Sequence, residues 1–171
     1  KLRLRSYGRT ERDSPVFMEL KKKYRSIVYK RRLTLPYDRA LDCLTGACPW
    51  PETQIGGEIR YTVDFYPDLE SRVFLAYERD SWLAPESGLR ITFDDAIRFR
   101  TADLTLDSDL WGTALLGPDQ VLMELKAPGA IPLWMVRLLT EMRLYKTSFS
   151  KYGTAYQLLL EREWKGGKRY A

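Results

Sequence analysis

The most constraining feature of this sequence is an alternation of cations and leucines that begins at its first residue. In Lys1-Leu2-Arg3-Leu4-Arg5, the three cations share one parity and the two leucines share the other. Because successive side chains of a β-strand point to opposite faces of its sheet, such a strand has one charged face and one apolar face. The same relation recurs along the chain between Glu19 and Lys21, Lys30 and Arg32, Tyr77 and Arg79, Arg90 and Asp94, and Glu124 and Lys126.

Several strands of this kind predict a sheet that curls around a charged interior, which would suit a polyanion. We expect strands over residues 1–7, 16–23, 26–35, 71–82, 89–94 and 121–126, with residues 97–101 continuing the edge of the fifth. Helices are expected over residues 36–44, 54–66 and 132–144, and again in the tail after residue 147. The predicted fold class is therefore α+β, with antiparallel strands and helices outside them.

The composition limits the classes of function. The chain has 171 residues, of which 44% are hydrophobic, so we expect a single globular domain over residues 1–171. Its formal net charge of +5, from 28 basic and 23 acidic residues, favours anionic partners without choosing among them. The chain has no histidine, which excludes Ser-His-Asp and Cys-His catalysis and every His-liganded metal site. Its chemistry must come from carboxylates, lysine, arginine, tyrosine, serine or a bound metal.

The two cysteines, Cys43 and Cys48, lie at the expected end of a helix and in the Gly- and Pro-rich loop that follows. Two thiolates without histidine form a poor zinc site, so we expect a structural or incidental role rather than a disulfide or a metal site. No apolar run approaches the roughly 20 residues of a membrane-spanning helix. We expect no signal peptide and a chain that begins inside a larger polypeptide, because it opens with a strand-like basic segment.

The charged positions have the chemistry that phosphate binding needs. Arginine binds phosphate oxygens through paired donors, lysine supplies a compact charge, and phosphoryl transfer usually adds a divalent metal held by carboxylate. The simpler interpretation, that each cation lies on an ordinary solvated face, is weakened because charges interrupt otherwise apolar strands. Asp94 and Asp95 are expected as turn residues. The candidate phosphate ligands are Arg3, Arg5, Lys21, Lys30, Arg32, Arg79, Arg90, Lys126 and Lys151, and the candidate metal ligands are Glu19 and Glu124.

Seven strings that carry these charges occur in order: KLRLRSYG, VFMELKKKY, VYKRRL, YERDSW, GLRITFD, VLMELK and FSKYG. Through them, residues 1–153 resemble the VTC (vacuolar transporter chaperone) domain of polyphosphate polymerases, within the CYTH-like triphosphate tunnel metalloenzyme superfamily. The resemblance implies an antiparallel β tunnel or barrel lined with basic residues, with helices packed outside. It also implies transfer of the ATP γ-phosphate onto a growing inorganic polyphosphate chain, with Mn²⁺ or Mg²⁺ as the metal.

The resemblance also assigns the family's functional residues to positions of this chain, motif by motif. It implies a metal-binding glutamate at Glu124, with Glu19 as a second candidate. It implies hydrogen-bond donors at Tyr77 and Ser150, although an aromatic packing role for Tyr77 fits equally well. The basic residues that it implies are Arg3 and Arg5 of R-x-R, Lys21 of E-x-K, Lys30 and Arg32 of the next strand, Arg79 of Y-x-R, Arg90 of L-R-I, Lys126 of L-E-x-K and Lys151 of F-S-K.

Family members that resemble this chain carry a further tunnel strand before the R-x-R motif. We therefore expect a tunnel that lacks its N-terminal strand and has an open edge, which a partner segment or chain would complete. The expected ligands are ATP and inorganic polyphosphate, without nucleic acid. The expected location is the cytoplasm or the cytoplasmic face of a membrane.

Two alternatives stay open. With an ordered water at the same site, the chain would be a triphosphatase that hydrolyses tripolyphosphate or a nucleoside triphosphate. A non-catalytic polyphosphate- or nucleic-acid-binding module would instead bind in a salt-sensitive way that is indifferent to metal and to Glu124. Nucleic acid ranks last because single-strand binders interleave aromatic and basic residues on one face, whereas Phe17, Tyr29 and Phe93 are expected on the face opposite the cations.

Overall fold

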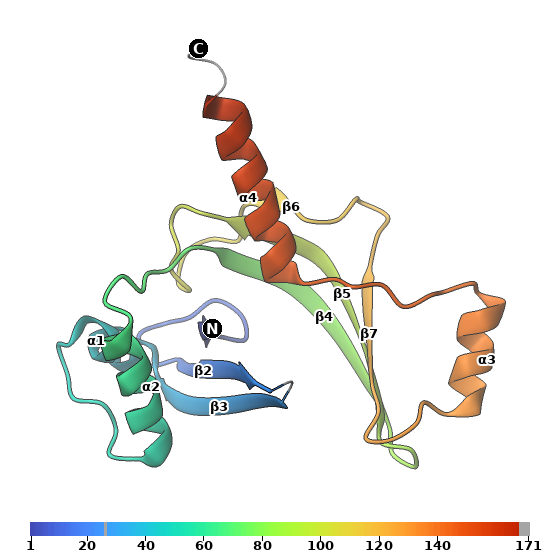
Figure 1. Cartoon of the computed structure of the whole chain (residues 1–171), viewed down its shortest axis with the longest axis horizontal. Helices are drawn as coiled ribbons and strands as arrows, with labels where there is room; N and C mark the ends of the chain where they lie inside the picture. Colours follow the sequence, from blue (N-terminus) through green and yellow to red (C-terminus); the bar gives the residue numbers. More distant parts are fainter. Residues whose placement is uncertain (26, 168–171) are drawn as a thin grey trace. The chain divides into compact units, whose positions relative to one another are not determined.

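The computed structural model describes residues 1–25 and 27–167. Over these residues the chain forms two compact units. Unit 1 comprises Lys1–Ser71 together with Leu104–Asp109, and unit 2 comprises Arg72–Asp103 together with the chain from Leu110 onward. Each unit has its own antiparallel sheet and its own pair of helices (Figure 1).

Unit 1 is built on a sheet with the strand order β1-β2-β3. β1 is Leu2–Arg5, β2 is Pro15–Tyr24 and β3 is Ile27–Pro36, and each neighbouring pair is antiparallel. β2 and β3 are consecutive strands in the chain and pair with each other as an antiparallel hairpin. The register places the middle of β2 directly between β1 and β3, so that side chains from all three strands meet on one face.

One face of this sheet is apolar and carries both helices of unit 1. Val16, Met18 and Leu20 of β2 are almost fully buried. α1, Tyr37–Thr45, and α2, Gln54–Phe65, contribute further buried side chains to the same cluster. The apolar face that the leucine–cation alternation predicts is thus confirmed for unit 1. The charged residues, which have the opposite parity in these strands, occupy the other face.

α2 confirms the helix expected over residues 54–66 and explains a glycine within it. The side chain of Thr53 caps the helix by accepting a hydrogen bond from the N–H of Gly56. A Cβ atom on Gly56 would lie 2.3 Å from the carbonyl oxygen of Pro51. Glycine is therefore required at this position by the close approach of the loop before the helix.

Unit 2 is built around β5, Leu89–Arg100. β5 pairs along its length with β4, Phe74–Ala84, across a register shift between Ala76 and Glu78. Its other edge pairs with β7, Leu122–Lys126, near the start of β5 and with β6, Thr113–Ala114, near the end. The strand expected over residues 89–94 and its expected continuation are therefore one strand.

The helices of unit 2 are α3, Leu133–Glu141, and α4, Lys151–Gly167. α3 lies within the helix predicted over residues 132–144. Three apolar residues at helical spacing in and just after α3 are exposed, with exposed fractions of 52% for Trp134, 43% for Leu138 and 60% for Met142. Among the described helices, none combines the length and the apolar composition that crossing a membrane requires.

The α+β class with antiparallel sheets is confirmed. Over the residues that the structure describes, neither the three-stranded nor the four-stranded sheet closes into a barrel. The closed tunnel therefore stays a prediction, as does the assignment of residues 1–171 to a single domain. What the fold does provide is one charged sheet face in each unit.

Candidate functional site

The charged face of the unit 1 sheet holds three arginines around one glutamate, which we call the Glu19 cluster (Arg3, Arg5, Glu19 and Arg32). Glu19 lies on the central strand, and Arg3 and Arg32 are its neighbours across the sheet. Arg32 Nη2 lies 2.7 Å from Glu19 Oε1, and Arg5 Nη2 lies 3.4 Å from the same oxygen. Arg3 donates to Oε2 through Nε, at 3.0 Å, and through Nη2. Three cations share one carboxylate, which leaves an excess of positive charge.

The carboxylate of Glu19 keeps these cations together. Burial by itself would raise the pKa of Glu19, but hydrogen bonds and charge from Arg3, with support from Arg5 and Arg32, hold this pKa below its usual value. Glu19 is therefore ionised at neutral pH and offsets the mutual repulsion of three guanidinium groups. The result is a cationic surface whose donors suit the oxygens of a phosphate.

Aromatic rings lie beneath these arginines, and the prediction that Phe17 faces away from the cations is wrong. Phe17 is two residues from Glu19 in the same strand, so the two side chains share a face. The guanidinium carbons of Arg5 and Arg32 lie 5.5 and 5.1 Å from the centroid of the Phe17 ring. Arg5 also lies 4.9 Å from the centroid of the Tyr7 ring. Cation–π contacts therefore add to the ion pairs that orient this cluster.

Lys21 and Lys30 extend the same face toward the turn of the hairpin. They lie directly across from each other in β2 and β3, and both are exposed. Like charges at directly opposed positions destabilise a sheet. A bound anion would relieve this repulsion.

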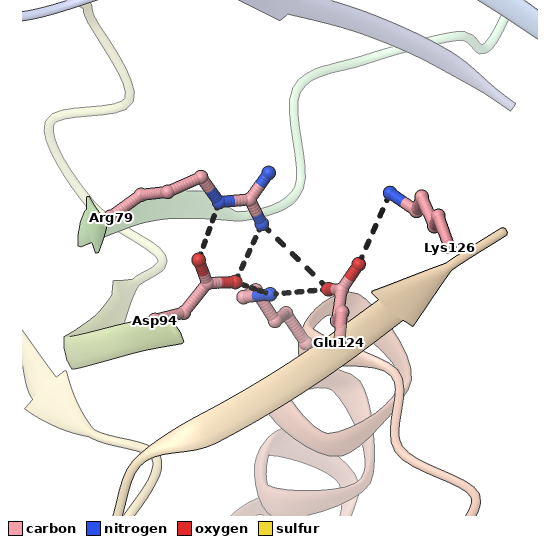
Figure 2. Close-up of polar contacts among 5 residues, drawn as sticks. Arg79, Asp94, Glu124 and Lys126 are labelled. Carbon is pink, nitrogen blue, oxygen red and sulfur yellow. Dashed lines mark hydrogen bonds and ion pairs between the residues drawn. The ribbon is translucent and has the colours of Figure 1, made fainter. Parts of the chain in front are cut away.

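Unit 2 holds a second charged cluster, the Glu124 cluster, formed by Arg79, Asp94, Glu124, Lys126 and Lys151 (Figure 2). Arg79 on β4 donates to both Asp94 oxygens, at 2.5 Å through Nε and 2.6 Å through Nη2. Lys151, the first residue of α4, bridges two carboxylates: its Nζ contacts Asp94 and lies 3.1 Å from Glu124 Oε1. Arg79 Nη2 is 3.7 Å from the same Glu124 oxygen, and Lys126 Nζ is 3.3 Å from the other.

Asp94 is the residue of this cluster that sequence reasoning missed, because the turn role expected of Asp94 and Asp95 is wrong. Both lie inside β5, where Asp95 is exposed and the Asp94 side chain is 0% exposed. The sequence signal for Asp94 is its shared parity with Arg90 in the strand expected over residues 89–94. An adjacent pair of aspartates is also typical of turns, which favoured a turn at the end of that strand over a role in the site.

The ionisation of this cluster follows from its contacts. Burial would raise the pKa of Asp94, but hydrogen bonds from Arg79 and Lys151 outweigh burial and lower it. The pKa of Glu124 is lowered in the same way, against burial, by Lys151 and then Lys126. The hydrogen bond with Asp94 raises the pKa of Arg79. At neutral pH the cluster therefore holds three cations and two carboxylates.

Of the two predicted hydrogen-bond donors, Tyr77 packs against cations of the Glu124 cluster, and Ser150 immediately precedes Lys151 in the chain. The Tyr77 ring centroid lies 5.1 Å from the guanidinium carbon of Arg79 and 4.8 Å from Lys151 Nζ, so the ring packs against both cations. Ser150 Oγ accepts a hydrogen bond from the N–H of Gly153 at 3.2 Å, which caps the first turn of α4. This cap helps to fix Lys151 at the start of the helix.

Arg90 lies near this cluster, but within the described part of the chain no ion pair joins it to the cluster. It is exposed and sits directly across from Lys126, with Thr92 of the same face opposite Glu124. The hydroxyl of Thr92 is buried and has no hydrogen-bond partner within the described residues. The predicted residues thus fall into two groups, namely Arg3, Arg5, Glu19, Lys21, Lys30 and Arg32 in unit 1, and Tyr77, Arg79, Arg90, Glu124, Lys126, Ser150 and Lys151 in unit 2.

The two candidate metal ligands, Glu19 and Glu124, both contact cations through both of their oxygens. Across the described residues, no group of three or more Asp, Glu, Cys or His side chains could hold a metal ion. Mg²⁺ commonly needs one or two carboxylates, with water and phosphate oxygens completing its coordination. Glu19 has both oxygens engaged by guanidinium groups. Both oxygens of Glu124 also contact cations, Lys151 at Oε1 and Lys126 at Oε2, so a metal ion at Glu124 would have to replace one of these contacts.

Comparison with known proteins adds one finding to this geometry. A family model described as the VTC domain matches residues 1–160, which is nearly the whole chain. No curated protein matches the chain. The matched segment contains both the Glu19 cluster and the Glu124 cluster.

Proposed function

The chain belongs to the VTC domain family, which is linked to polyphosphate synthesis, and from this premise we propose that it is a polyphosphate polymerase. In this proposal it transfers the γ-phosphate of ATP onto the end of an inorganic polyphosphate chain. The observation that carries the proposal is the Glu124 cluster, where cations from three elements converge around two carboxylates.

The Glu124 cluster supports phosphate binding because its cations are already oriented. The ammonium group of Lys151 contacts both Asp94 and Glu124, which fixes its position at the start of α4. Asp94 fixes the Arg79 guanidinium from one side through two hydrogen bonds. Donors held in place before the substrate arrives cost no reorganisation as charge develops during the reaction.

The reaction itself asks little of the protein beyond position and charge. A terminal oxygen of the polyphosphate attacks the γ-phosphorus of ATP, a new P–O–P bond forms, and the bond to the bridging β–γ oxygen breaks, releasing ADP. The attacking phosphate oxygen is already an anion at neutral pH, so no general base is required. This agrees with a chain that contains no histidine. Arg79, Lys126 and Lys151 would offset the charge on the transferred group.

A divalent ion, Mn²⁺ or Mg²⁺, belongs to this proposal. Glu124 would hold it together with phosphate oxygens, and it would supply further neutralisation of phosphate charge. Lys126 and Lys151, which contact opposite oxygens of Glu124, would keep that carboxylate ionised and oriented.

The Glu19 cluster, with Lys21 and Lys30, would bind the phosphates of the substrate or of the growing chain. Its three arginines supply paired donors on a surface with one carboxylate. The closed tunnel expected from the family resemblance, ATP as donor and a cytoplasmic location are parts of the same proposal.

The proposal is tested by removing the charge of Glu124 while keeping its shape. Glu124→Gln should abolish metal-dependent ATP turnover, whereas binding of tripolyphosphate, measured by calorimetry, should largely persist because the cations are retained. The matched control is Asp80→Asn, which neutralises an exposed carboxylate of β4 at the parity opposite Arg79. Unchanged turnover in Glu124→Gln would reject the metal-binding role.

The product distinguishes the proposed function from its alternatives. Long-chain polyphosphate made from ATP supports a polymerase, and release of phosphate from tripolyphosphate supports a triphosphatase. Binding that is salt-sensitive but indifferent to metal and to Glu124→Gln supports a non-catalytic module.

A further inference from the structure

The two cysteines lie closer together than their expected incidental role requires. Cys43 is in the last turn of α1, and Cys48 follows in the loop beyond it. Gly46 adopts a left-handed conformation, with φ of 80°, that ends the helix and turns the chain back. The N–H groups of Ala47 and Cys48 both donate to the carbonyl of Asp42, at 2.8 and 3.3 Å. This folded-back loop brings the two sulfur atoms to 3.2 Å.

We propose that Cys43 and Cys48 are a redox-modification site that forms a reversible disulfide with a low-molecular-weight disulfide as oxidant. The two sulfurs need to approach by about 1 Å more to reach a covalent S–S distance of about 2.05 Å. Both cysteines are free thiols in this structure, so the proposed bond is a second state of the same pair. The proposal is independent of phosphate chemistry.

The two thiols have different surroundings, which assigns them different steps. Cys43 is 2% exposed, whereas Cys48 is only partly buried and lines a surface recess with Arg12, Arg39 and Asp42. Burial, then the neighbouring Cys48, raises the pKa of the Cys43 thiol to about 11. An external disulfide can therefore reach Cys48, while Cys43 stays protonated and protected at neutral pH.

The reaction balances as two exchanges. The Cys48 thiolate attacks one sulfur of glutathione disulfide, which forms a mixed disulfide and releases one glutathione. Cys43 then loses its proton and attacks the Cys48 sulfur, which forms the internal disulfide and releases a second glutathione. The two cysteine thiols are oxidised and one glutathione disulfide is reduced to two thiols. The short distance makes the second exchange intramolecular, which offsets the small thiolate fraction of Cys43.

The bond would act on the apolar side of unit 1. Cys43 belongs to the buried cluster behind the three-stranded sheet, and Cys48 and Trp50 pack against that cluster. A disulfide would tie the end of α1 to the loop that leads to Thr53, the residue that caps α2. It would restrain both helices while leaving the cations of the Glu19 cluster untouched, because those lie on the other face of the sheet.

The test is a redox titration of the folded protein in buffers of reduced and oxidised glutathione. After acid quenching, free thiols are alkylated under denaturing conditions. The mass of the peptide that carries both cysteines is then measured by mass spectrometry. Alkylation of both cysteines should be lost together as the buffer becomes oxidising, and reduction of the protein should restore it. Retention of both thiols at the oxidising end, or accumulation of glutathione adducts without an internal bond, would overturn the proposal.

Serine variants separate the two roles. Cys43→Ser should accumulate a glutathione adduct on Cys48, whereas Cys48→Ser should leave Cys43 unmodified while the protein stays folded by circular dichroism. Equal adduct formation in both variants would contradict the assignment. Should a variant fail to fold, a brief alkylation pulse on the folded wild-type protein decides the order, since Cys48 must be labelled first. Simultaneous labelling of Cys43 and Cys48 would overturn the assignment of Cys48 as the thiol that reacts first.

Discussion

Asp94 shows how a single buried carboxylate can prepare a cationic site. Isolated burial of such a charge is costly, and here the cost is offset by two hydrogen bonds from Arg79 and the contact with Lys151. The same contacts restrict the rotamers of two long, flexible side chains. Asp94 thus acts as a positioning residue for the cations that we propose bind phosphate.

Replacing Asp94 with asparagine tests this positioning role. Asp94→Asn keeps the side-chain volume but removes the charge, so Arg79 and Lys151 lose their buried partner. We expect unit 2 to lose about 2 kcal/mol of unfolding free energy, the scale of a hydrogen bond to a charged group. Urea unfolding measures this loss, and Asp80→Asn should be nearly neutral in comparison. Equal midpoints for the two variants would contradict the role.

Arg79 and Arg90 should behave differently although both are candidate phosphate ligands. Arg90 is exposed and outside the ion-pair network, so Arg90→Ala should weaken tripolyphosphate binding with a change in stability within about 0.5 kcal/mol. Arg79→Ala should weaken binding and also destabilise unit 2, because Asp94 is left buried without its main partner. Calorimetry and urea unfolding separate the two effects. Full binding by either variant would remove that arginine from the site.

The lowered pKa values of Asp94 and Glu124 predict an acid-sensitive unit 2. A carboxyl whose pKa is lower in the folded than in the unfolded state stabilises the fold fully above its unfolded value, about 4. This contribution is lost as the pH falls from there through the folded pKa. Urea midpoints measured from pH 7 down to pH 3 should therefore decline, and the decline should be shallower in Asp94→Asn. Parallel curves for the two proteins would contradict this source of acid sensitivity.

At the scale of strands and helices, the alternating pattern predicted which residues share a face of a strand better than it predicted which strands pair. It predicted the charged face shared by Glu19 and Lys21. It could not predict which strands are neighbours, because parity relates side chains within one strand only. The bridge from Lys151 on α4 to two strands therefore became visible only in the structure. The exposed face of α3 likewise shows that helical periodicity predicts an apolar face without showing what covers it.

Gly56 provides a test of how closely the start of α2 packs against the loop before it. Gly56→Ala should destabilise unit 1 by about 1–3 kcal/mol, because the new methyl group would clash with the carbonyl oxygen of Pro51. The matched control is Gly57→Ala, where no atom lies within 4 Å of the added Cβ. That variant should be neutral or stabilising by up to about 1 kcal/mol, through helix propensity. Similar unfolding midpoints for both variants would contradict the close approach of the Pro51 carbonyl to Gly56.

At the scale of the whole molecule, the two units share one plan. Each has an antiparallel sheet whose charged face gathers arginines or lysines around fewer carboxylates, in the Glu19 cluster and in the Glu124 cluster. The net charge of +5 is consistent with both clusters binding anions. This distribution could be anticipated from the recurring parity, whereas the division into two units could not, because no linker of distinctive composition marks it.

The central claim is that the protein extends polyphosphate from ATP, and the size of the product tests this most directly. The full-length protein is incubated with ATP and Mn²⁺, and the products are separated by length on a gel, with Glu124→Gln and Asp80→Asn in parallel. The account predicts long polyphosphate from the wild type and from Asp80→Asn, and none from Glu124→Gln. Release of orthophosphate without any chain longer than the substrate, or equal synthesis by Glu124→Gln, would contradict it.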